Sequence, residues 1–178
     1  MQVKTFPIGP LEVNCYLAIN DKSAVVFDPG GDPAPVIAEV EAQGAKVEAI
    51  YNTHMHFDHI YGNAAMSKYA NLPIQVPEGD ANIMDTELAM GGFMGFPRVD
   101  AFMSVKIGPG QVQVMGMDMN ILHTPGHSSG SLCFHFPEAK ACIVGDLIFA
   151  RSIGRTDFPG GDYETLLNSV REKIFTLP

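Results

Sequence analysis

The run His54-Met55-His56-Phe57-Asp58-His59 places three imidazoles and one carboxylate within six residues. The preceding Val47–Asn52 has the β-branched and aromatic content of a strand, whereas Ile60–Tyr69 has the apolar spacing of a helix. Because residues i and i+2 of an extended segment point to the same side, His54 and His56 can bind one metal ion. The run therefore predicts a metal site at a strand-to-helix junction.

Asp58 and His59 fall in the first turn of the predicted helix, further along the chain than the first two imidazoles. They are suited to a second metal ion or to orienting water. Two metal ions about 3.5–4 Å apart can hold one bridging hydroxide and polarise a carbonyl group. The run thus favours hydrolytic metal chemistry over a solvated turn of polar residues.

A second cluster, His123-Thr124-Pro125-Gly126-His127, follows an apolar segment that predicts a strand. Its Pro-Gly pair imposes a turn, which holds His127 in a fixed direction at the strand end. We expect His127 to be a metal ligand, and His123 to pack or form a hydrogen bond behind the ligands. His135, within the predicted strand Ser131–Phe136, is expected to be an ordinary strand residue.

Two carboxylates each follow directly after a predicted strand. Asp146 follows the buried-strand pattern of Ala141–Gly145, where an unpaired carboxylate is costly, so a metal ion is its expected partner. Its two oxygens also allow it to bridge two cations. Asp28 follows the strand pattern Ala24–Phe27 and either orients ligands or caps the turn.

Together these residues make the chain resemble the metallo-β-lactamase superfamily, whose motifs occur here in the family's order over roughly residues 3 to 160. The matching segments are Val13–Leu17, Asp28–Gly30, Thr53–His59, Thr124–His127 and Gly145–Asp146. Within the superfamily the chain is most similar to the glyoxalase II branch of hydroxyacylglutathione hydrolases, and to its shorter relatives without a C-terminal helical domain. The stretch Ile153–Phe158 supports that branch and its close neighbours.

The resemblance implies an α+β fold, an αββα sandwich with a dinuclear metal site at one edge. In that family the first metal ion would be bound by His54, His56 and His127. The second would be bound by Asp58 and His59, with Asp146 bridging the two. Asp58 would also be catalytic, because it would orient the attacking hydroxide and accept its proton.

Arg155 lies nine positions after Asp146, where a basic residue of the family contacts the carboxylate end of a glutathione thioester. The resemblance therefore implies substrate binding by Arg155, although an arginine in an exposed loop is often merely solvated. One family feature is missing: a further His, usually in a Gly-His-Gly turn, that completes the second metal site. The chain reaches Ile174–Pro178 without it, so we expect one metallo-β-lactamase-like domain over residues 1–178 that is incomplete at its C-terminus.

The composition narrows the choice of substrate and compartment. With 46% hydrophobic and 17% charged residues, the chain has the make-up of a globular protein. Its net charge of −9 argues against a nucleic-acid substrate, because phosphate binding needs clustered Lys and Arg. No apolar run approaches the ~18 residues of a membrane span, and no secretion signal opens the chain. Cys15, Cys133 and Cys142 indicate reduced, buried thiols of a cytoplasmic protein.

We therefore predict a metal-dependent hydrolase that cleaves a small-molecule thioester, such as an S-acylglutathione, through a metal-bound hydroxide. Two Zn²⁺ ions are expected, the second site being short of a ligand, and iron or manganese suits the same mixed donors. The main alternative is a mononuclear iron persulfide dioxygenase that uses only His54, His127 and Asp146. Another hydrolase of the superfamily, a lactonase or β-lactamase, and a metal-binding protein without catalysis also stay open.

The remaining pattern predicts alternating strands and helices. Strands are expected near residues 2–8, 13–19, 24–28, 47–52, 73–76, 111–116, 119–123, 131–136 and 141–145, and helices near 34–43, 59–70, 80–90 and 162–175. The glycine-rich apolar segment Met90–Pro97 fits neither pattern. It is either a mobile lid, whose Phe93, Met94 and Phe96 cover an apolar part of the substrate, or a loop that packs its rings onto the core.

Overall fold

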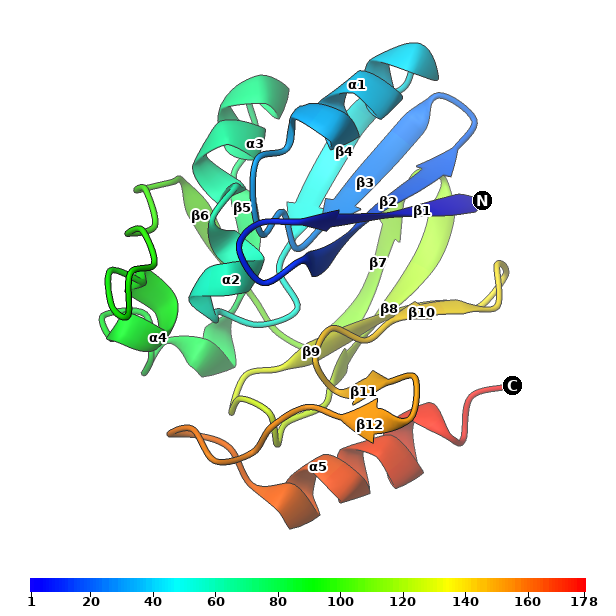
Figure 1. The fold of residues 1–178 in the computed structure, drawn as a ribbon. Coiled ribbons are helices and arrows are strands. Elements are labelled where there is room, and N and C mark those ends of the chain that lie inside the picture. The colour runs from blue at the N-terminus through cyan, green and yellow to red at the C-terminus, as the bar shows by residue number, and fades with distance from the viewer.

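Six strands in chain order form the first sheet of the computed structural model, which describes residues 1–178 (Figure 1). Their bounds are β1 (Gln2–Ile8), β2 (Val13–Asn20), β3 (Ser23–Phe27), β4 (Lys46–Tyr51), β5 (Ile74–Pro77) and β6 (Ser104–Ile107). The first three strands pair antiparallel, whereas β3 to β6 run parallel to one another. The carboxyl ends of β3, β4 and β5 therefore lie at the same edge of the sheet.

Four antiparallel strands form the second sheet, in the order β10-β9-β8-β7. They are β7 (Gly110–Val114), β8 (Met117–His123), β9 (Leu132–Phe136) and β10 (Ala141–Ile143). A short hairpin of β11 (Ile148–Phe149) and β12 (Ser152–Ile153) follows. The α-helices are α1 (Ala34–Ala42), α2 (Phe57–Ile60), α3 (Asn63–Ala70), α4 (Glu87–Met90) and α5 (Tyr163–Ser169), with a 3₁₀ turn η1 (Glu78–Asp80) and a π-helical turn η2 (Val170–Ile174).

An aromatic and aliphatic core lies between the two sheets. Phe27 of β3 and Tyr51 of β4 meet Phe134 and Phe136 of β9 there, and the ring centroids of Phe27 and Phe134 are 5.1 Å apart. Because strand side chains alternate between faces, each sheet also turns apolar residues outward. A second cluster joins the first sheet to α1 and α3, and a third joins the second sheet to α5 (Figure 1). The predicted αββα sandwich is confirmed.

The helix expected near residues 59–70 is divided into α2 and α3 at Gly62. The Gly62 amide donates to the carbonyl of Pro29 at 2.6 Å. A Cβ at Gly62 would lie 2.1 Å from the carbonyl oxygen of Gly31, so only glycine permits this approach. Contact with the turn after β3, which local periodicity does not reveal, sets the place of the break.

The helix expected near residues 80–90 is wrong over most of its length, since α4 covers only Glu87–Met90. The chain before it makes tight turns, in which the amide of Ile83 donates to Asp80 and that of Thr86 to Ile83. These bonds span three residues instead of the four of an α-helix. The short strands β6, β11 and β12 were not predicted. None of the helices combines the length and the apolar content needed to cross a membrane.

Candidate metal centre

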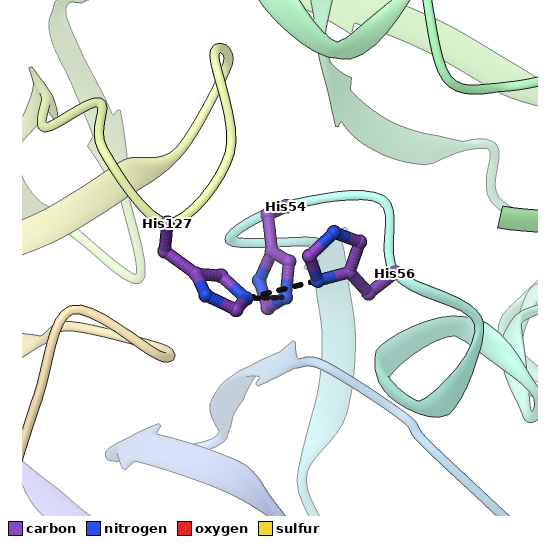
Figure 2. Close-up of side chains that lie close together, drawn as sticks. All are labelled: His54, His56 and His127. Carbon is purple, nitrogen blue, oxygen red and sulfur yellow. Dashed lines mark hydrogen bonds between the residues drawn. The ribbon is translucent and has the colours of Figure 1, made fainter. Parts of the chain in front are cut away.

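Two loops from different sheets bring three imidazoles together. His54 and His56 lie on the loop after β4, and His127 lies on the loop between β8 and β9 (Figure 2). The Nε2 atoms of His54 and His127 are 3.1 Å apart, and His127 Nε2 is 2.9 Å from His56 Nδ1. All three side chains are buried. The structure thus gathers the three residues predicted for the first metal ion.

A second group of possible ligands shares His54 with the first. Its other members are His59 from α2 and Asp146 after β10, and the donor atoms of the three lie within 4.8 Å of one another. His59 Nε2 is 3.2 Å from Asp146 Oδ1, whereas His127 Nε2 is 3.7 Å from Asp146 Oδ2. Asp146 therefore stands between the two groups, where a bridging carboxylate would lie.

In three of the histidines, a hydrogen bond on the side of the ring that faces away from the centre places the proton on Nδ1. His127 Nδ1 donates to a backbone carbonyl at 2.8 Å, and His59 Nδ1 donates to Asp28 Oδ2 at 3.0 Å. Thr53 Oγ1 donates to Asp28 at 2.6 Å, so the hydroxyl oxygen is left to accept from His54 Nδ1. A neutral imidazole protonated on Nδ1 carries a lone pair on Nε2. In their neutral form these three rings therefore present Nε2 lone pairs to the shared centre.

This arrangement fits a metal cation. His54 Nε2 and His127 Nε2 face each other across 3.1 Å with no proton to share, and Nε2 of His56 has no hydrogen-bond partner. Burial lowers the pKa of His54 well below its ordinary value and that of His56 to about 3, so both rings are neutral at pH 7. Neutral imidazole is the form that binds metal. A cation satisfies these atoms together.

His59 has a different electrostatic environment. Burial alone would lower its pKa, but the carboxylates of Asp28 and Asp146 outweigh that effect and raise the pKa well above its ordinary value. The two carboxylates concentrate negative charge on one side of the centre, which favours a cation there, either a proton or a metal ion.

Asp58 lies beside the two ligand groups. Its Oδ2 is 3.8 Å from His59 Nε2, and 15% of its side chain is exposed. The carboxylate belongs to neither of the two close-set groups. Its expected roles as a ligand of the second metal ion and as a catalytic base stay predictions.

The backbone and the side chain of Arg155 face different partners. Its carbonyl oxygen is the acceptor for His127 Nδ1. Its guanidinium donates to the carboxylate of Asp157 through two hydrogen bonds of 2.8 and 2.7 Å, and lies 3.7 Å from the ring centroid of Phe158. The pair is half exposed. The substrate role implied for Arg155 stays a prediction, and the structure adds that its charge is already paired.

Three other residues take the following places. Asp28 is fully buried and accepts from the amide and hydroxyl of Thr53 and from His59, so it orients ligands, one of the two roles left open. His123 is exposed and its Nε2 lies 2.9 Å from the Ser129 carbonyl, outside both groups. His135 is a buried residue of β9, also outside both groups.

Asp80 is a buried carboxylate of the site that the sequence analysis missed. It is fully buried at the end of η1 and accepts hydrogen bonds from both ligand-bearing loops. The available signal was an acidic residue shortly after the strand Ile74–Pro77, at the sheet edge where Asp28 also follows a strand. Because the sequence pattern wrongly predicts a helix near residues 80–90, it assigns Asp80 to that helix.

Two cavities meet at the metal centre and share Leu11, Asp58 and Asp146 in their walls. The larger has a volume of about 360 Å³ and an aromatic and apolar lining that includes Phe57, Leu88, Phe93, Met94, Phe96 and Phe158, and the charged Arg155 also lines it. The smaller, about 180 Å³, is more polar and is lined by residues that include Glu12, Asn14, Tyr16 and Phe149. A substrate at the centre can therefore extend to both sides of it.

The segment Met90–Pro97 packs its rings and also forms a wall of the larger cavity. The rings of Phe93 and Phe96 have centroids 5.2 and 5.1 Å from that of Phe57, which follows His56 in the ligand loop. Met94 is 87% exposed at the rim. Packing of the rings, one of the two interpretations left open, is thus present, and the same rings face the cavity.

Comparison with known proteins decides the family. The family model described as the metallo-beta-lactamase superfamily matches residues 8–175. The chain belongs to the metallo-beta-lactamase superfamily. This confirms the resemblance inferred from the motifs, and the metal-binding chemistry of the superfamily agrees with the donor set described above.

Relatives within the superfamily match nearly the whole chain. A probable metallo-hydrolase of Bacillus subtilis, YqgX, is 34% identical over 100% of this chain and 86% of its own length. The hydroxyacylglutathione hydrolase GloC of Haemophilus influenzae is 33% identical over 99% of this chain and 86% of its own. The crystal structure of the B3 metallo-beta-lactamase BLEG-1 superposes with a TM-score of 0.91, at 32% identity, over 99% of this chain and 87% of that one.

Replacing His54 should remove more metal than replacing any other imidazole, because His54 belongs to both ligand groups. For His54→Ala we expect zinc affinity to fall by more than the roughly 10–100-fold typical of residues that only support a ligand. The measurement is the zinc-to-protein ratio after loading and dialysis. His135→Ala is the matched control, a buried histidine outside both groups, and should keep the ratio of the unsubstituted protein. Equal zinc in the two variants would contradict the assignment.

Proposed function

We propose that this metallo-hydrolase cleaves the thioester bond of a small molecule such as an S-acylglutathione. The name of the Haemophilus influenzae relative, a hydroxyacylglutathione hydrolase, supports this substrate class. The observation that carries the proposal is the junction of the two cavities at Asp58 and Asp146, beside both ligand groups. A bond cleaved there has room for a substituent on each side, as an acyl group and a thiol require.

Metal ions would be held by the two groups that share His54, with His56 and His127 in one and His59 and Asp146 in the other. Zn²⁺ suits the imidazole-rich group, and iron or manganese suits the mixed nitrogen and oxygen donors. Bound there, such ions supply Lewis acidity and lower the pKa of water. Everything else that the reaction needs must come from the chain itself.

Asp58 is placed to handle the proton of the attacking water. Its carboxylate lines both cavities and is not held by a strong ion pair, its nearest imidazole nitrogen being 3.8 Å away. It can therefore accept a proton and orient water toward a carbonyl carbon at the junction. The aromatic wall formed by Phe57, Phe93 and Phe96 gives the larger cavity an apolar side. A thiolate is a good leaving group, so the reaction needs little help from an acid.

Arg155 would attract the anionic end of a glutathione thioester. Its guanidinium lines the larger cavity and is held in place by Asp157 and by the face of Phe158. Because the carboxylate of Asp157 already neutralises much of the charge, the contribution to binding should be modest. Because the Arg155 side chain is largely exposed, salt in solution should weaken its electrostatic contribution to binding further.

Hydrolysis of a β-lactam is the second candidate function, favoured by 32% identity with the B3 metallo-beta-lactamase BLEG-1 across nearly the whole chain. The dioxygenase alternative has less support. It leaves His56 without a ligand role, yet His56 is buried with its Nδ1 2.9 Å from His127 Nε2. One set of assays separates the three reactions.

The zinc-loaded and iron-loaded proteins are each given three substrates. We expect thiol release from S-lactoylglutathione under nitrogen with kcat/KM of at least about 10⁴ M⁻¹ s⁻¹, the lower end for ordinary enzymes. The other two readouts are opening of a chromogenic β-lactam and oxygen uptake with glutathione persulfide. His54→Ala protein is the blank for all three. Faster turnover of the lactam or the persulfide than of the thioester would refute the proposal.

Arg155→Ala should raise KM for S-lactoylglutathione by about fivefold at low salt, the upper range for an exposed ion pair, with kcat within about twofold. The corresponding thioester of the uncharged thiol N-acetylcysteamine should show no change in KM. Arg151→Ala is the matched control, because Arg151 is an exposed arginine of the neighbouring hairpin that lines neither cavity. An equal rise for both thioesters would show that Arg155 does not act through its charge.

A further inference from the structure

Asp80 is a carboxylate in the interior of the protein without a cation as a direct partner. Its exposed fraction is 0%, and it ends η1, shortly after β5. An unpaired charge in such a place is costly unless several donors surround it. The identity of those donors therefore indicates what the residue does.

All three hydrogen bonds of Asp80 come from the loops that carry the metal ligands. Oδ2 accepts from the amide of Met55 at 3.0 Å and from Ser128 Oγ at 2.9 Å. Oδ1 accepts from the amide of Gly130 at 2.6 Å. Met55 separates His54 from His56, and Ser128 follows His127 directly. One carboxylate thus joins the loop after β4 to the loop between β8 and β9.

The backbones around Asp80 are built for this contact. A Cβ at Gly130 would lie 2.3 Å from the amide nitrogen of Asp80, and a Cβ at Gly79 would lie 2.8 Å from the Cα of Gly130. Both positions therefore have to be glycine for η1 to reach the second loop. Ser129 Oγ adds a separate bond to the carbonyl of Gly79 at 2.9 Å. The approach of η1 to the His127 loop is a specific feature of the fold.

The other buried carboxylate of the site acts on a different part of it. Asp28 accepts from Thr53 and from His59, which belongs to the group with Asp146. The bonds of Asp80 instead flank His56 and His127, the two imidazoles found only in the first group. Asp80 therefore supports the first group from behind, whereas Asp28 supports His59 directly and His54 through Thr53.

We propose that Asp80 is a positioning residue that holds His54, His56 and His127 in register and thereby sets the metal affinity of that group. The two ligand loops come from different sheets, and His127 is 73 residues from His54, so nothing local fixes their separation. Hydrogen bonds to an ionised carboxylate are roughly twice as strong as neutral ones. The negative charge behind the loops also favours a cation in front of them. The role holds whichever reaction the metal centre catalyses.

The test measures zinc binding to metal-free protein by competition with a chromophoric chelator. In Asp80→Asn one oxygen becomes an amide that cannot accept from the loop donors. We expect zinc to bind the first group roughly 10–100-fold more weakly, the range for groups that orient metal ligands. The visible spectrum of the cobalt-substituted protein should change as well, because the ligand positions shift. Far-UV and near-UV circular dichroism of the metal-free protein reports whether the variant is folded.

A milder pair of variants keeps the test decisive if Asp80→Asn does not fold. Ser128→Ala removes one donor to Asp80 and should weaken zinc binding about threefold or more, which is less than the roughly tenfold of one whole hydrogen bond to a charged group because two donors to Asp80 remain. Ser129→Ala, the neighbouring serine that bonds to Gly79 and Asn82 but not to Asp80, should bind zinc as the unsubstituted protein does.

Three results would overturn the proposal, and two of them concern metal binding alone. One is a folded Asp80→Asn protein whose zinc affinity is within twofold of the unsubstituted protein and whose cobalt spectrum is unchanged. The other is an equal loss of affinity in Ser128→Ala and Ser129→Ala, which would mean that the loop matters and its bond to Asp80 does not. Loss of thioester hydrolysis with zinc affinity unchanged would likewise count against a role in metal binding.

Discussion

The close approach of neutral imidazoles in the protein interior is the constraint on which the rest of the site depends. His54, His56 and His127 are buried with ring nitrogens about 3 Å apart, and burial keeps His54 and His56 unprotonated. Lone pairs that face one another at this distance repel unless a cation lies between them. The protein must hold these rings in place by contacts from behind, because the facing Nε2 lone pairs of His54 and His127 do not attract each other.

Those contacts come from the architecture of the two sheets. The carboxyl ends of β3, β4 and β5 lie at one edge, so Asp28, the ligand loop and Asp80 follow neighbouring strands. Ligands of α/β sheets commonly bind at such an edge. The second sheet adds His127 from an antiparallel connection and Asp146 after β10. Each sheet alone has only part of the donor set, and packing of the aromatic core brings the two parts together.

The same edge also provides the two cavities. The ligand loop itself contributes Phe57, on which the rings of Phe93 and Phe96 pack to form an apolar wall. The more polar cavity on the other side begins at the turn between β1 and β2. Metal ligands and substrate walls are therefore carried by the same short loops. A change in the packing of the cavity walls is therefore expected to shift the metal ligands as well.

Much of this could be predicted from the sequence, because strand and helix periodicity and the spacing of His and Asp in motifs are local properties. They determined the set of candidate donors, and the family resemblance that these motifs carry implied the superfamily and the αββα sandwich. Only the tertiary structure decided that His54 is shared by both groups, that Asp157 pairs with Arg155, that Gly62 divides a helix and that Asp80 joins the two loops. The reason is physical: most of these features are contacts between segments tens of residues apart, and local patterns contain no information on which distant backbone or carboxylate will lie behind a given loop.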